Sequence, residues 1–386
     1  MAEIQIPEEY EGEEEIEILF DEDDNLVDPS LMDSDQQTEF NDNLAEFLDS
    51  STLSEISSQV LTNFQNDLDS REDWYETFKD GLELLGIQND PRSEPFEGAS
   101  GVYHPLLAEA VTHFQAQAYK ELLPANGPVD TKVMGASSDP KAMQANRVKD
   151  FMNYQLLYKM EEYDPEMDQM LFFLPLAGSA FKKCYFDPAI GRIVSRFIKA
   201  EDLVVPYSAT DLHTSPRITH RMSMTENDLL KLQLSGFYLD TDMNAPMYGG
   251  DNDSVQSKID EIDGVTRTGD QHDFTLLECH TELDIEGFEH TDNEGEPTGL
   301  ALPYIVTVCK DTNDVLAIRR NYVETDPMRK KVEYFTHFKF LPGLGFYGFG
   351  LIHMIGGVTK SATAILRQLI DAGTLANLPA GFKARG

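Results

Sequence analysis

The residues that most resemble a chemical site form one short glycine-rich turn. Residues 343–348 read GLGFYG, a G-x-G-x-x-G pattern between a strand-like and a helix-like segment, with Asp371 further along. In dinucleotide-binding proteins this pattern brings a pyrophosphate to a helix N-terminus, and an acidic residue after the second strand binds the ribose. Here Phe346 and Tyr347 crowd the turn, Asp371 is inside the predicted helix, and no βαβ unit surrounds the pattern. We therefore predict a strand-to-helix hinge, formed by Gly343, Gly345, Gly348 and Gly350.

Other candidate chemical groups are scattered along the chain. The nine histidines show no pair at metal-ligand spacing with a third ligand nearby, and His213 and His220 flank a Ser-Pro dipeptide typical of a loop. Ser179 has no base beside it in the sequence, and nucleophile-elbow and Walker A motifs are absent. Three cysteines are too few and too scattered for a disulfide framework. The sequence predicts a structural or assembly protein, not an enzyme, with no cofactor and no metal.

Acidic residues dominate the charge of the chain. Asp and Glu number 69 against 30 Lys and Arg, which gives a formal net charge of −39. Residues 1–70 hold 22 acidic residues and no Lys or Arg, whereas residues 301–386 hold 6 acidic and 11 basic residues. An acidic body binds nucleic acid weakly because phosphate neutralisation needs clustered Lys and Arg, so it suits a surface that DNA passes without sticking. No apolar stretch is long enough to predict a membrane span.

Residues 1–50 predict a disordered acidic leader. The stretch EGEEEIEILFDEDD mixes dense like charges with isolated apolar residues, and such a segment cannot bury enough surface to fold alone. Two functions fit this composition. The leader either keeps the chain in solution, or its segment Ile16 to Phe20 docks on a basic groove of a partner.

Hydrophobic periodicity predicts an α+β fold in which helices come first and strands follow. The predicted helices cover 53–85, 104–123, 141–163 and a short segment that begins at Pro165. The predicted strands lie in a hairpin at 180–198, in EDLVVPY, at 274–283, in a hairpin at 303–320 and at 333–340. A short helix capped by Thr225 interrupts the β-rich block.

A long helix is predicted after the glycine-rich turn, from Gly357 to Leu378. Apolar residues, many of them small, occupy most of its circumference, which predicts burial against several neighbours. Lys360 and Arg367 are seven residues apart and share one face. The helix is either a core helix with a solvated stripe, or a helix that packs beside copies of itself in a ring. Because the chain stops soon afterwards at Gly386, we expect it to be a fragment.

The order of these segments resembles the portal (head-to-tail connector) proteins of tailed bacteriophages. KKCYFDPAIGRIVSRFIKAEDLVVPY is similar to the family's wing hairpin, and IVTVCKDTNDVLAIRRNY, with Leu316 and Asn321, to its next wing strands. LPGLGFYGFG followed by ILRQLIDAGTLANLPAGF is similar to the entry into the family's stem. The resemblance covers residues 70–386. One departure is Leu351, which stands where the family's Y-G-x-G turn continues with Pro.

The resemblance implies a structural subunit of a portal vertex. The family builds a dodecameric ring through which a terminase motor drives double-stranded DNA into the capsid and through which the DNA leaves, and the ring itself hydrolyses nothing. The implied domains are an α+β wing at 51–340 and, at 341–386, a hinge with the first stem helix, before the clip, tunnel loop and crown. The implied location is the virion, after assembly in the host cytoplasm.

The implied partners are copies of the chain, terminase, the major capsid and scaffold proteins, a head-tail adaptor and passing DNA, without a membrane. Contacts to DNA in the channel or to a neighbouring subunit are expected at Lys360, Arg367 and Asp371, and the sequence leaves both options open. An alternative is another virion assembly protein, a scaffold or head-tail adaptor, whose acidic leader is a docking arm.

Overall fold

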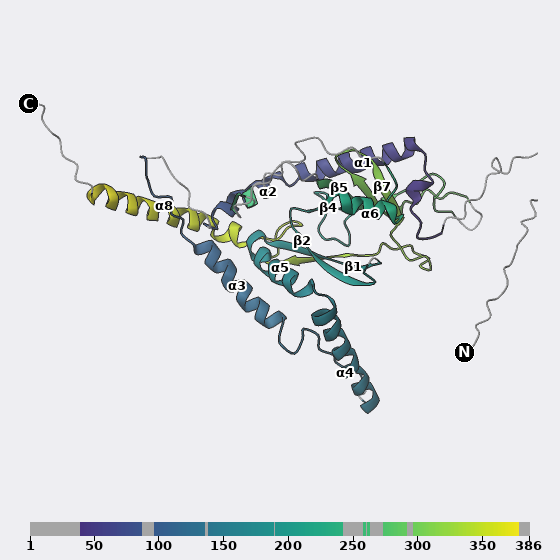
Figure 1. Cartoon of the computed structure of the whole chain (residues 1–386), viewed down its shortest axis with the longest axis horizontal. Helices are drawn as coiled ribbons and strands as arrows, with labels where there is room; N and C mark the ends of the chain where they lie inside the picture. The colour runs from purple at the N-terminus through teal and green to yellow at the C-terminus, as the bar shows by residue number, and fades with distance from the viewer. Residues whose placement is uncertain are drawn as a thin grey trace, which may run out of the picture. The chain divides into compact units, whose positions relative to one another are not determined.

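The computed structural model describes residues 39–86, 96–135, 138–188, 190–241, 258–259, 261–262, 273–291 and 296–377. These residues form a mixed α+β fold in which most helices precede the sheets, as predicted. The chain divides into one unit at 1–42 and a second, larger unit at 43–386 (Figure 1). The leader motif at 16–20 and the terminal LPAGFKARG lie outside the described residues.

The helices of the first half of the chain largely follow the predicted pattern. Their bounds are η2 Leu44–Glu46, α1 Ser50–Asp69, α2 Glu72–Glu83, α3 Leu106–Leu122, α4 Asp139–Tyr154 with a π-helical turn η3 Gln155–Lys159, and α5 Tyr163–Ala177. The stripe predicted as one helix from 53 to 85 is two helices that meet at Arg71. The Arg71 guanidinium points inward and donates to the carbonyls of Ala200 and Leu203, at 2.8 and 3.1 Å.

Two antiparallel sheets form the β-rich block. A three-stranded sheet has the order β2-β1-β8, and a five-stranded sheet has the order β3-β4-β5-β6-β7. The strand bounds are β1 Ser179–Asp187, β2 Arg192–Lys199, β3 Leu203–Val204, β4 Arg217–Thr225, β5 Asp273–Leu283, β6 Leu302–Cys309, β7 Val315–Arg320 and β8 Phe335–Lys339. Both predicted hairpins are present, as β1–β2 and β6–β7.

One strand of the larger sheet was not predicted. β4 pairs with β5 along its whole length, and His220 lies within it opposite Glu278, so the expectation of a loop at His220 is wrong. Apolar and polar residues alternate in part of the sequence RITHRMSMT, but its histidine and arginines interrupt the apolar pattern that would indicate a strand. The helix predicted after β4 is present as α6 (Glu226–Leu234), and Thr225 Oγ1 accepts the Asp228 N–H at 3.2 Å as its cap.

The folded unit begins inside the predicted leader, so the expected boundary at residue 50 is too late. Leu44 and Ala45 are buried. The side chain of Asn43 donates to the Leu316 carbonyl at 3.1 Å and accepts the Ile318 N–H at 2.9 Å, which completes the outer edge of β7. A short polar segment is held here by two hydrogen bonds to a strand that lies far away in the sequence.

The main hydrophobic core lies where the first helices meet the smaller sheet. Apolar side chains from α2, α3, α5, β1 and the first turn of the last helix, α8 (Leu351–Asn377), pack together there. Phe78, Leu107 and Phe181 are fully buried at its centre. α8 contacts α2, α3 and α5, so the predicted wing and the predicted stem entry belong to one compact unit.

Candidate functional site

The glycine-rich turn that leads into α8 is fastened to β1. Gly348 donates its backbone N–H to Ser179 Oγ at 2.8 Å, and Ser179 Oγ lies 3.1 Å from His337 Nε2 on β8. Burial lowers the pKa of His337 to about 3, so the ring is neutral at ordinary pH. The sequence showed no base beside Ser179, but the fold brings His337 next to it. Because Ser179 is fully buried, this pair positions the turn and has no access to a substrate.

The four glycines predicted as a hinge lie in different surroundings. A Cβ added to Gly348 or Gly350 would overlap the backbone around Gly178, which has a φ of +89° at the C-terminal end of α5. A Cβ on Gly343 would overlap a carbonyl of its own turn, whereas Gly345 faces open space. Three of the four glycines therefore permit close backbone packing. The flexibility expected of this turn stays a prediction.

α8 begins directly after this turn, at Leu351, six residues earlier than predicted. Its buried residues are Ile352, Gly356, Thr359 and Thr363, which recur every three or four residues along one face. Ile352 packs against Gly81 of α2, where any side chain on the glycine would collide with it. Thr363 accepts the His104 N–H at 3.0 Å. The face that α8 turns to its own chain is thus apolar at its start, through Leu351, Ile352 and Ile355, and mostly small or polar from Gly356 onward.

Two of the three predicted contact residues hold the segment before α3. Arg367 Nε donates to the Val102 carbonyl at 2.8 Å, and its guanidinium lies 4.3 Å from the centre of the Tyr103 ring. Asp371 accepts the Ser100 N–H at 2.7 Å. The structure therefore brings Arg367 and Asp371 together, one turn apart, as a clamp on residues 100–103.

Lys360, the third predicted residue, is exposed and lies apart from this clamp. Within the described residues it makes no hydrogen bond or ion pair. Its ammonium can therefore meet an external phosphate or carboxylate. Contacts of Lys360, Arg367 and Asp371 with DNA or with a neighbouring subunit stay predictions.

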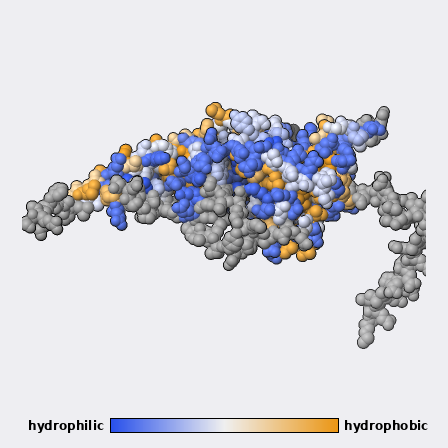
Figure 2. All heavy atoms as spheres, turned by 90° about the horizontal axis from the view of Figure 1, so that it is seen from above, coloured by the Kyte–Doolittle hydropathy of each residue, from blue (hydrophilic) through white to orange (hydrophobic). Residues whose placement is uncertain are grey.

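One face of α8 packs on α2, α3 and α5, but its outward face is apolar and is not covered by the described residues, so the predicted burial around most of the helix is not seen there. The exposed fractions of Val358, Ile365 and Leu369 are 60%, 66% and 70%, and Met354 and Leu375 are exposed as well. Figure 2 shows hydrophobic residues at the end of the folded unit that α8 forms. An apolar helix face exposed to water is typical of a surface that a partner buries on binding.

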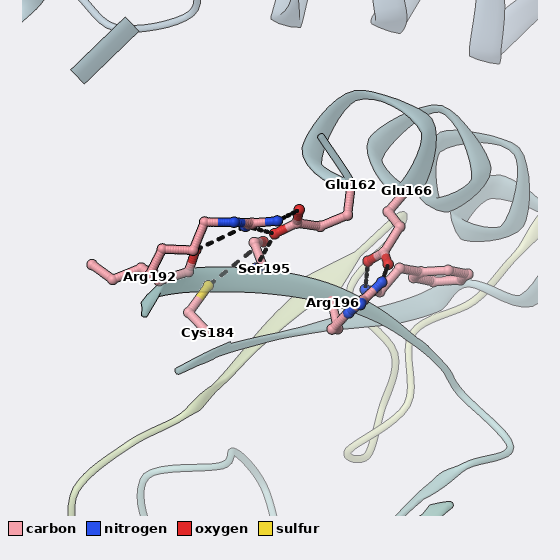
Figure 3. Close-up of polar contacts among 8 residues, drawn as sticks. Glu162, Glu166, Cys184, Arg192, Ser195 and Arg196 are labelled. Carbon is pink, nitrogen blue, oxygen red and sulfur yellow. Dashed lines mark hydrogen bonds and ion pairs between the residues drawn. The ribbon is translucent and has the colours of Figure 1, made fainter. Parts of the chain in front are cut away.

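The β1–β2 hairpin is fixed to α5 by paired glutamates and arginines (Figure 3). Glu162 accepts both terminal nitrogens of Arg192, each at 2.8 Å, and Glu166 accepts Arg196 at 2.8 Å. Burial raises the pKa of Glu162, but the Arg192 guanidinium outweighs burial and lowers it overall. Glu166 also accepts the backbone N–H of Phe197. These bonds orient the β1–β2 hairpin relative to the helix.

A buried polar cluster that the sequence did not predict joins the two sheets. Glu278 on β5 accepts Lys183 Nζ from β1 at 2.6 Å to each carboxylate oxygen, and His280 Nε2 lies 2.7 Å from Glu278 Oε1. Burial lowers the pKa of the neighbouring His220 to about 4. The cluster adjoins a pocket lined by His280, Asn321 and Lys331 among others. Its members come from three strands, so their spacing in the sequence gave no signal.

None of these groups forms a recognisable catalytic or metal centre. Among the described residues, no three His, Cys, Asp or Glu side chains are placed to hold a metal ion. No described helix is both long and apolar enough to span a bilayer. The candidate functional site is the outward face of α8 with Lys360, because large apolar side chains face water there.

Comparisons with known proteins add no family. No protein-family model matches the chain, and a search of the curated proteins finds no match.

Proposed function

We propose that this chain is a structural subunit of a bacteriophage portal, which assembles into a ring around passing double-stranded DNA. The observation that carries the proposal is the distribution of side chains on α8 from Gly356 onward, where the inward face is mostly small or polar and large apolar side chains face outward. Copies of α8 side by side would remove these side chains from water, at about 25 cal/mol for each Å² of apolar surface buried. A closed ring repeats one such contact around its axis.

Charge supports the same function. The chain carries −39 overall, so a channel through its copies would offer few sites at which phosphates could be held. Lys360, exposed on α8, would then be a weak contact to the DNA or to an acidic residue of a neighbouring subunit. The remaining partners of the proposal are terminase, capsid and scaffold proteins and a head-tail adaptor, in the virion.

The test is the assembly state of the full-length protein at micromolar concentration. Sedimentation velocity and negative-stain electron microscopy should show rings of about twelve copies, the number that the family resemblance implies. The double variant Ile365→Asp with Leu369→Asp should remain monomeric while its thermal unfolding is unchanged, since both side chains already face solvent. Leu234→Asp is the matched control, because Leu234 on α6 is 89% exposed. It should leave the rings intact.

A full-length protein that stays monomeric under these conditions would overturn the proposal. Rings formed equally by the Ile365→Asp, Leu369→Asp variant would show that the outward face of α8 is not the contact.

A further inference from the structure

The helix α4 is supported by polar contacts on one side only. Asn153, its one buried residue, accepts the Val129 N–H at 2.9 Å and donates to the Val129 carbonyl at 3.0 Å. Thr131 donates to the Ala145 carbonyl at 2.9 Å, and the link between α3 and α4 thus runs along this side. Figure 1 shows α4 beyond the end of α5, away from both sheets.

The opposite side of α4 and η3 carries large apolar side chains that nothing in the described chain covers. The exposed members are Met143, Val148, Phe151, Tyr154 and Tyr158. Phe151 is 59% exposed and Tyr158 is 72% exposed, and Tyr154 stacks on Tyr158 with 5.9 Å between ring centres. A helix of this length is marginal in water unless packing supports it. This outward face therefore has the composition of a docking surface.

The same region differs in charge from the rest of the chain. Residues 124–160 hold five Lys or Arg and three Asp, in a chain whose net charge is −39. Lys149 is paired with Asp130 at 2.7 Å, and Lys141, Arg147 and Lys159 are exposed. The apolar face is thus accompanied by positive charge, which favours a ligand with both acidic and apolar side chains.

We propose that the outward face of α4 and η3 binds an acidic peptide segment with closely spaced large apolar side chains, supplied by a second copy of this chain. The sequence EGEEEIEILFDEDD at residues 11–24 has this chemistry, with apolar residues from Ile16 to Phe20 between blocks of Asp and Glu. Its apolar side chains would cover Phe151 and Tyr158, and its carboxylates would meet Arg147 and Lys159. This face would thus supply the basic docking surface that the leader motif requires.

The experiment measures binding of a fluorescent peptide of residues 11–24 to the full chain by anisotropy. Because every copy carries a competing segment, the receptor is the full chain with Ile16→Ser, Leu19→Ser and Phe20→Ser. We expect saturable binding that weakens as NaCl rises. Phe151→Ser and, separately, Arg147→Glu should each weaken binding about tenfold. Tyr207→Ser is the matched control, because Tyr207 is an exposed aromatic residue elsewhere, and binding should be unchanged.

A peptide with serine at Ile16, Ile18, Leu19 and Phe20 keeps every charge and should bind at least about tenfold more weakly. Equal binding of the two peptides, or equal binding by the Phe151→Ser receptor and its parent, would overturn the proposal. Near-ultraviolet circular dichroism establishes that each receptor variant is folded. The result is independent of ring formation, because α8 is unaltered in all of these variants.

Discussion

Lys183 on β1 contacts both carboxylate oxygens of Glu278 on β5, each at 2.6 Å, and this ion pair spans the two sheets. Both side chains are 13% exposed, so the pair lies largely out of water. A buried ion pair adds little over a well-packed apolar pair, but a single remaining charge is costly. The relative position of the sheets therefore depends on both partners being present.

Lys183→Met should destabilise the fold by about 3 to 5 kcal/mol, because it leaves the Glu278 carboxylate buried without its cation. Chemical denaturation at pH 7 measures this loss. The double variant Lys183→Met with Glu278→Leu should recover most of the stability. If the double variant is as unstable as the single one, packing rather than charge explains the loss.

The same pair predicts a dependence on acid. Burial raises the pKa of Glu278, but Lys183 and His280 outweigh burial and hold it well below its ordinary value of 4.5. A carboxyl whose pKa is lowered by folding stabilises the folded state above the unfolded pKa. This contribution should therefore decline as the pH falls below 4.5. In the Glu278→Gln variant, the unfolding free energy should fall less between pH 5 and pH 3 than in the parent protein.

Glu201 predicts the opposite dependence near neutral pH, where the unfolding free energy should fall as the pH rises. Burial, with a smaller effect from Asp202, raises the pKa of Glu201 from 4.5 to about 7. Within the described residues its two carboxylate oxygens have no hydrogen-bond partner. Between these two pH values the unfolded chain has released the proton that the folded chain retains, so stability should decrease as the pH rises from 4.5 to about 7.

Glu201→Gln should remove this slope and raise the unfolding free energy at pH 8 by about 1 to 3 kcal/mol. At pH 4 the variant and the parent should be similar. Glu324→Gln, at an exposed position, is the control and should change neither value. Parallel pH profiles for Glu201→Gln and the parent would contradict the prediction.

Gly348→Ala should disrupt the entry into α8, because the new methyl group would overlap the Gly178 carbonyl. We expect a loss of about 2 kcal/mol or more in unfolding free energy. Gly345→Ala is the matched control in the same turn, where a Cβ meets only open space, and it should have little effect. Equal thermal stability of the two variants would show that the turn relaxes to accept a side chain at Gly348.

Asp371→Ala should release the segment before α3 from α8. Asp371 accepts the Ser100 N–H, so hydrogen exchange at that amide should accelerate about tenfold in the variant. Global stability should change by no more than about 1 kcal/mol, because the bond is only partly buried. Lys360→Ala, on the same helix, should leave the exchange rate at Ser100 unaltered.

Local patterns predicted the elements better than the contacts between them. The β1–β2 and β6–β7 hairpins and the Thr225 cap follow from alternation and turn composition, which act over a few residues. The β4 strand was missed because His220, Arg217 and Arg221 interrupt the apolar pattern. Long-range pairs such as Lys183 with Glu278, 95 residues apart, leave no mark on local spacing.

The candidate site was predicted in part. The sequence singled out Arg367 and Asp371 but not their bonds to residues 100–102, since a helix face cannot be assigned to a neighbour without the fold. It also predicted that the apolar residues of α8 are buried. Hydrophobic periodicity indicates that such side chains become buried, but it does not indicate whether the same chain or a partner buries them.

The glutamates at the start of α5 also cover part of the open edge of a sheet. β2 is the outer strand of its sheet, and an outer strand with free backbone donors recruits strands from other molecules. Glu162 and Glu166 accept the N–H groups of Ser195 and Phe197 from that open side. An incoming strand would have to displace carboxylates that arginines already hold, so these two contacts oppose sheet extension between molecules at Ser195 and Phe197.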